Sequence, residues 1–157
     1  MSVVTNDQAA GYPTIYCNAK TNAAVMTNGL EIFTTTGDVL VFAILSECYT
    51  ANGATASTLQ YSATNNTTTT SQTMSGASAS LANAAQGVSV IAQLGALANA
   101  PTVSNAAGVG VFPWGAVRVP GGSSIKLVVG VGSTTGTWKH YIHWQPLEQG
   151  AVVVPSF

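Results

Sequence analysis

The chain contains 157 residues, of which four are Lys or Arg and five are Asp or Glu, and its formal net charge is −1. Charged residues make up 6% of the chain, against about one-quarter in typical soluble domains, and so sparse a charge protects a surface poorly against association. Four scattered basic residues cannot form the patch that nucleic acid binding requires, and no apolar run is long enough to span a membrane. We therefore expect one domain, residues 1–157, that is largely covered by other subunits and binds neither nucleic acid nor membrane.

The polar residues that replace charge predict an all-β domain. Thr favours strands, whereas Asn and the 16 Gly favour turns. The run 38–49 is apolar and is expected to be a central strand buried on both faces, and 58–64 alternates Leu59 and Tyr61 with polar residues, as in a strand with one solvated or partner-facing side. Further strands are expected at 14–17, 30–33, 77–86 and 88–94, with a helix as the competing interpretation of the Ala-rich segment 77–86.

Two polar or interrupted segments are expected to be connections. Residues 65–70 are too polar for a core and predict either a surface loop or a loop that docks on a neighbouring subunit. Residues 96–107 are broken by Pro101 and are expected to connect strands.

The last third of the chain has the clearest pattern. Strands are expected at 117–119, 125–131 and 137–145, with turns at 120–122 and 132–136, and the short Gly-bounded loop predicts that the last two strands form a hairpin. Within 137–145 one face carries Trp138, His140, Ile142 and Trp144 and the other carries Lys139, Tyr141, His143 and Gln145. The first set is expected to face the core because the Trp side chains bury large apolar areas.

Both chain ends are expected to serve as arms. Residues 1–12 lie before the first predicted strand, and residues 147–157 include an apolar run, 151–154, that predicts a final strand or an arm. The first five residues lack the basic residues and the apolar stretch of a signal peptide, which predicts synthesis in the cytoplasm.

The residues that carry chemistry do not form a catalytic or metal-binding pattern. The five carboxylates are scattered, and His140 and His143 are three apart on a strand, so they face opposite sides of it. Cys17 and Cys48 lie in apolar strands and are expected to be free thiols in a reducing compartment, with a disulfide as the alternative. We expect no catalytic, metal or cofactor site.

The closing region resembles a family of virion proteins. Residues 119–155 contain Pro-Gly-Gly, a Lys-bearing apolar strand, Thr-Gly-x-Trp and an aromatic strand that runs into Pro-Leu-x-x-Gly-Ala-x-Val-Val. This order is similar to the C-terminal part of small virion proteins of tailed bacteriophages, and weaker similarity extends to 35–39 and 58–95. The resemblance implies a head decoration or cement protein with an antiparallel β-sandwich or jelly-roll fold, often a trimer, on the outside of a capsid.

Two kinds of binding are consistent with these features. A decoration protein would contact the major capsid protein and other copies of itself, and the aromatic and basic residues expected at such an interface are Tyr61, Trp114, Lys139, Tyr141 and His143. The alternative is a tail or head fibre domain that binds host glycans, in which Tyr141 with Trp114 or Tyr61 would form a stacking platform. A depolymerase is the third class, and it would be recognised by turnover of capsular polysaccharide.

Overall fold

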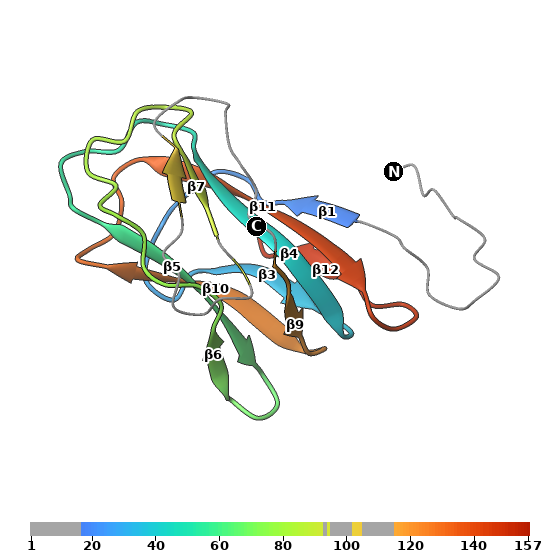
Figure 1. Ribbon diagram of the computed structural model, residues 1–157. Coiled ribbons are helices and arrows are strands. Elements are labelled where there is room, and N and C mark those ends of the chain that lie inside the picture. The colour runs from blue at the N-terminus through green and yellow to red at the C-terminus, as the bar shows by residue number, and fades with distance from the viewer. Residues whose placement is uncertain (1–16, 93, 95–101, 105–114) are drawn as a thin grey trace.

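Two antiparallel β-sheets pack face to face in this protein (Figure 1). The computed structural model describes residues 17–92, 94, 102–104 and 115–157, and within these ranges it contains strands and turns but no helix. The expected all-β, antiparallel β-sandwich is therefore confirmed. The strands are β1 (Cys17–Lys20), β2 (Ala24–Val25), β3 (Glu31–Thr35), β4 (Val39–Cys48), β5 (Thr58–Asn65), β6 (Ser71–Thr73), β7 (Ser89–Ile91), β8 (Thr102–Ser104), β9 (Val117–Val119), β10 (Ser123–Gly130), β11 (Thr137–Pro146) and β12 (Val153–Pro155).

The two sheets differ in size. The seven-stranded sheet has the order β1-β11-β4-β7-β8, with β2 paired to β11 and β9 paired to β4. The five-stranded sheet has the order β12-β3-β10-β5-β6. Strands β4 and β11 are the longest and pair along their whole length, which makes them the centre of the larger sheet.

The central strand β4 confirms the apolar run 38–49 as a strand but not its burial on both faces. Alternate residues such as Val39 and Val41 are fully buried, whereas Leu40 and Leu45 on the outer face are half-buried. Opposite β11 the register shifts between His143 and Trp144, so that Phe42 is the extra residue of a β-bulge. An apolar run can therefore mark a strand whose outer face is available for contact.

The two faces of β11 are as the alternation predicts. Trp138 and His140 are completely buried, and Ile142 and Trp144 are 2% and 5% exposed, so these four side chains face the core. Lys139 lies on the opposite face, with Tyr141 and His143. The core between the sheets is completed by apolar side chains of both layers, including Met26, Phe33, Val41, Ile44, Leu59, Met74, Leu81, Ile125, Leu127 and Val153.

A buried polar network joins the two sheets. The Ser46 hydroxyl of β4 lies 2.7 Å from the Tyr61 hydroxyl of β5 and 2.6 Å from Nδ1 of His140 in β11. All three side chains are fully buried, and burial lowers the pKa of His140 from about 6.5 to about 3. His140 is therefore neutral in the folded protein at pH 7. Its Nε2 atom has no hydrogen-bond partner in the described part of the chain.

The expected hairpin of the last third is wrong. β10 belongs to the five-stranded sheet and β11 to the seven-stranded sheet, so the turn between them carries the chain across the sandwich. Asn52 holds this turn, because its Oδ1 atom accepts hydrogen bonds from the backbone N–H groups of Thr135 (2.9 Å) and Gly136 (3.2 Å). Gly-rich residues specify a change of direction, but they do not specify whether the next strand pairs with the previous one.

Residues 77–86 form neither the expected strand nor the competing helix. Their backbone groups bond to loops and strand ends: Leu81 N–H donates to Ser57 C=O at 2.8 Å, and Asn83 N–H donates to Gly53 C=O at 2.7 Å. Asn83 has a φ of 57°, which ends any regular repeat at that point. The segment is thus an irregular cover over the β4–β5 end of the sandwich.

Of the expected strand 14–17 only Cys17 lies within the described residues, where it begins β1, and of the expected connection 96–107 the described part, 102–104, is strand β8 paired to β7. The C-terminal segment forms a strand, since β12 pairs with β3. Residues 1–12, the expected N-terminal arm, lie outside the described residues. No helix in the described part of the chain is long and apolar enough to cross a membrane.

Candidate interaction surface

The outer face of β11 gathers charged and aromatic side chains from three neighbouring strands. Because β1 and β4 pair with β11 on its two sides, residues far apart in the sequence become neighbours: Lys139 lies opposite Glu47, and Tyr141 lies opposite Lys20. We call this surface the β11 face. It comprises Asn18, Lys20, Phe42, Glu47, Tyr49, Lys139, Tyr141 and His143.

Each lysine of the β11 face lies over a tyrosine ring. The Lys139 ammonium is 3.7 Å from the ring centroid of Tyr49, and the Lys20 ammonium is 5.8 Å from that of Tyr141. A cation in this position is attracted by the negative face of the ring, by about 0.5–1 kcal/mol at an exposed site. These contacts hold the long lysine side chains in place and reduce the entropy lost when a partner binds.

Tyr141 also binds the acidic residue of this face. Its hydroxyl donates a hydrogen bond of 2.8 Å to Oε2 of Glu47. Partial burial, and then the hydrogen bond to this carboxylate and its negative charge, raise the pKa of Tyr141 to about 12. Tyr141 is consequently a hydrogen-bond donor over the whole physiological pH range.

His143 lies at the other end of the β11 face, beside the β-bulge. Its Nδ1 atom is 2.6 Å from Oδ1 of Asn18 in β1, and its ring meets that of Phe42 edge-on, with 6.1 Å between the centroids. Phe42 lies on the same face as Leu40, two residues earlier in β4, and is next to the register shift.

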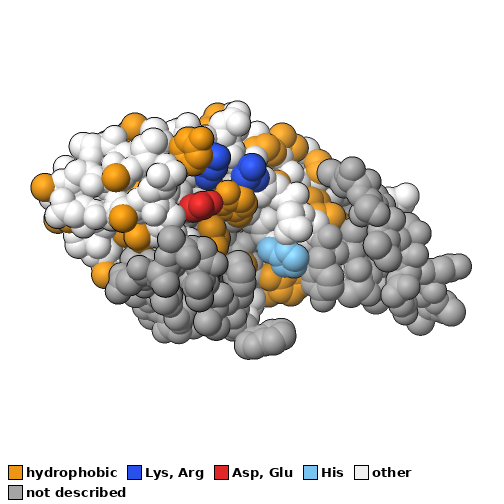
Figure 2. All heavy atoms as spheres, turned by 90° about the horizontal axis from the view of Figure 1, so that it is seen from above, with side chains coloured by type: hydrophobic (Ala, Val, Ile, Leu, Met, Phe, Trp, Pro, Cys, Tyr) orange, Lys and Arg blue, Asp and Glu red, His pale blue; other side chains and the backbone are white. Residues whose placement is uncertain are grey.

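The geometry of the β11 face is suited to binding another protein. It is a pleated surface, and tyrosines set on a rigid sheet are typical of the residues that dominate interface energies. Figure 2 shows the basic, acidic and histidine side chains of this view close to one another among hydrophobic side chains. The described residues contain no group of three or more His, Cys, Asp or Glu side chains that could hold a metal ion.

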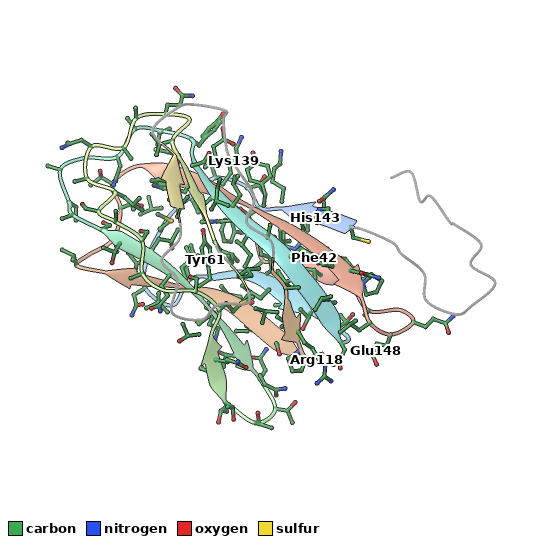
Figure 3. All side chains as sticks on the ribbon, in the orientation of Figure 1. Phe42, Tyr61, Arg118, Lys139, His143 and Glu148 are labelled. Atoms are coloured by element: carbon green, nitrogen blue, oxygen red, sulfur yellow. The ribbon has the colours of Figure 1, made fainter. Side chains whose placement is uncertain are left out.

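The structure brings together three of the five residues expected at an interface. Lys139, Tyr141 and His143 share the β11 face, and Figure 3 shows Lys139 and His143 on the outer side of the seven-stranded sheet. Tyr61 is a correction: it is completely buried between the sheets, where its hydroxyl binds Ser46, so it cannot contact a partner or stack on a sugar. Trp114 lies outside the described residues.

Sequence reasoning missed the partners that β1 and β4 contribute. Glu47 alternates with buried residues in the apolar run of β4, and its outward position follows from that alternation once the strand is known. Lys20 and Asn18 could not be placed, because their position depends on the pairing of β1 with β11 from the far end of the chain.

A second charged cluster lies at one end of the sandwich, where Figure 3 labels Arg118 and Glu148. Arg118 forms an ion pair with Asp38, whose Oδ1 atom also accepts the Gly121 N–H at 3.0 Å. The Gly121 hydrogen bond, followed by the Arg118 side chain, lowers the pKa of Asp38. Glu148 accepts the backbone N–H of Asp38 at 2.8 Å, so two carboxylates that are distant in the sequence meet here. Both carboxylates accept hydrogen bonds from backbone N–H groups of the loops at this end.

In comparisons with known proteins, no family model, curated protein or solved structure matches the chain. The two cysteines are free, Cys48 in the core and Cys17 half-buried in β1. They lie opposite Trp138 and Trp144 respectively, near the two ends of β11.

Proposed function

We propose that this protein is a head decoration protein of a tailed bacteriophage, which binds the outside of the capsid as a trimer and stabilises the shell. The observation that carries the proposal is the β11 face, where aromatic and charged side chains are held in fixed positions in a chain that has very few charges. The β-sandwich fold and the resemblance of residues 119–155 to phage virion proteins support it.

Stabilisation would follow from mass action and needs no chemical step. A protein that binds only the assembled shell lowers the free energy of the shell by RT ln(1 + [L]/Kd), where [L] is the concentration of the free decoration protein. This is about 2.7 kcal/mol per site when [L] is 100 times Kd. A trimer that engages several capsid subunits at once gains further from the high effective concentration of its second and third contacts.

The β11 face favours a protein partner over a glycan. Sugar rings stack on open aromatic faces, whereas Tyr49 and Tyr141 each already carry a lysine ammonium over the ring. Tyr61, the other described candidate for a stacking platform, is buried. A fibre domain that binds host glycans is therefore the less favoured function.

The test is co-sedimentation of the purified protein with emptied heads of the phage that encodes it. Wild-type protein should sediment with the heads, and Tyr141→Ala and Lys139→Ala should each weaken binding at least tenfold. Lys126→Ala, on the outer face of the five-stranded sheet, is the matched control and should bind as the wild type does. Protein that remains with tails or host cells, or β11-face variants that bind heads normally, would contradict the proposal.

A further inference from the structure

Two of the four basic residues of the chain are neighbours on the β11 face. Lys20 in β1 is opposite Tyr141 in β11, and Lys139 is two residues before Tyr141 on the same face of that strand. Such diagonal neighbours on adjacent strands are about 7–8 Å apart, a distance that two long side chains can bridge. Two positive charges so close repel each other, so the placement costs free energy unless a negative charge lies between them.

The described residues do not place that negative charge between the two lysines, and neither lysine forms an ion pair with them. Glu47 is directly opposite Lys139 in the register of β4 and β11. However, Oε2 of Glu47 accepts the hydrogen bond of the Tyr141 hydroxyl at 2.8 Å, and the Lys139 ammonium lies over the Tyr49 ring instead. Tyr141 therefore engages the carboxylate that could otherwise neutralise Lys139.

The other two basic residues are matched by acidic ones. Arg118 forms an ion pair with Asp38, and Lys126 lies opposite Glu31 in the register of β10 and β3. The β11 face, by contrast, has two lysines and a single glutamate among the described residues, and thus a surplus of positive charge. A surplus of this kind favours a partner that is acidic where it meets this face.

We infer that the β11 face recognises Asp or Glu side chains on the outer surface of the major capsid protein, with a carboxylate bound between Lys20 and Lys139; the inference rests on the proposed function. Such a carboxylate can accept charge-assisted hydrogen bonds from both ammonium groups and relieve the repulsion between them. The tyrosine rings beneath the ammonium groups already restrict their positions, which reduces the entropy lost on binding.

Co-sedimentation of charge variants with emptied heads tests the sign of the partner's charge. Lys20→Gln and Lys139→Gln should each weaken binding about two- to fivefold, the range for one exposed ion pair, and Lys139→Arg should restore it. Glu47→Gln still accepts the Tyr141 hydrogen bond but removes a charge that repels the partner, so it should bind more tightly than the wild type. Lys126→Gln is the matched control on the opposite sheet and should bind as the wild type does. Circular dichroism verifies that each variant is folded.

Salt and zero-length cross-linking provide two further measurements. Binding of the wild type should weaken between about 0.1 M and about 1 M salt, as the screening length falls from roughly 10 Å to roughly 3 Å. The double variant Lys20→Gln/Lys139→Gln should lose most of this dependence. A carbodiimide joins a lysine amine to a carboxylate in contact with it, so mass spectrometry of treated complexes should find Lys20 or Lys139, but not Lys126, linked to Asp or Glu of the capsid protein.

The outcomes separate this inference from the proposed function. Binding to heads that salt does not weaken, that Lys139→Gln strengthens or that Glu47→Gln weakens would overturn the acidic partner and leave head decoration standing. Links from Lys20 and Lys139 only to carboxylates of their own chain in the complex would do the same. Protein that does not sediment with heads at all overturns the proposed function, and this inference with it.

Discussion

At the scale of single residues, a neutral histidine in the core makes the stability of this sandwich depend on pH. His140 is fully buried against Ser46 and Tyr61, and burial lowers its pKa from about 6.5 to about 3. Between these two values the unfolded chain binds a proton that the folded chain does not. The free energy of unfolding is therefore greatest above pH 6.5 and falls as the pH drops towards 3.

Urea denaturation between pH 7 and pH 4 should consequently show a loss of several kcal/mol, since one pKa unit corresponds to about 1.4 kcal/mol. His143→Gln should retain this dependence because His143 lies on the outer face of β11, whereas His140→Gln should remove it, whatever its effect on stability at pH 7. The pKa of Asp38 is also lowered in the folded protein, so this carboxyl adds to the loss of stability as the pH falls. Its contribution begins only below about pH 4, the ordinary pKa of an Asp side chain. A flat profile for the wild type between pH 6 and 4.5 would contradict the role of His140.

Trp138 and Trp144 are the residues whose truncation should damage the core most. Each is buried on the inner face of β11, and replacing a buried Trp by Ala costs about 3–5 kcal/mol, a large part of the stability of a typical domain. Trp138→Phe should cost much less, because it keeps an aromatic ring and removes a buried indole N–H that has no partner among the described residues. Lys139→Ala should unfold at nearly the wild-type urea concentration. The opposite order would place the wrong face of β11 in the core.

At the scale of elements, close packing of glycines fixes the loops at the end of the sandwich where Asp38, Arg118 and Glu148 meet. A Cβ atom on Gly121 would lie 2.8 Å from the Cα atom of Gly37, so the β9–β10 turn and the β3–β4 loop approach each other through two residues without side chains. Asp38 reinforces the contact by accepting the Gly121 N–H. The loops at this end thus depend on backbone contact as much as on charge.

Gly121→Ala should lower the free energy of unfolding by about 1–3 kcal/mol, because the added methyl group meets backbone that cannot move aside easily. Gly29→Ala shows the effect of backbone strain without steric overlap. Gly29 has a φ of 82°, but a Cβ atom added there would meet no atom within 4 Å. Its replacement should therefore lower the free energy of unfolding by about 1–2 kcal/mol through backbone strain alone. Crystal structures of the two variants would show displaced loops only for Gly121→Ala.

The sequence was informative where a strand follows a simple alternation and uninformative where position depends on distant pairing. The faces of β11 and the inward position of Tyr61 follow from alternation, although Tyr61 was also assigned to the interface because aromatic residues serve both roles. The crossing from β10 to β11 was missed because the same turn residues serve hairpins and crossovers. The β11 face could not be assembled because Lys20 and Glu47 join it only through the pairing of β1 and β4 with β11.

At the scale of the whole molecule, the distribution of charge predicts self-association. Between Glu47 and Arg118 the chain contains no charged residue, and the loop that follows β4 belongs to this stretch. A surface of this kind lacks the repulsion that keeps domains apart. Purified protein should therefore scatter light as an oligomer, expected to contain three 15.9 kDa chains, at micromolar concentration and at both low and high salt. A stable monomer under these conditions would contradict the prediction.

The pairing of early strands with late ones has a consequence for biosynthesis. β4 leaves the ribosome long before β11, its main partner, and the interval between β3 and its partner β12 is longer still. At roughly 5–20 residues per second, the apolar β4 remains without that partner for on the order of ten seconds during translation. Pairings so distant in sequence also fold slowly, because a large loop must close before any contact forms. The nascent chain therefore passes through a period in which an apolar strand is open to aggregation, and its yield should depend on chaperones and on the temperature of synthesis.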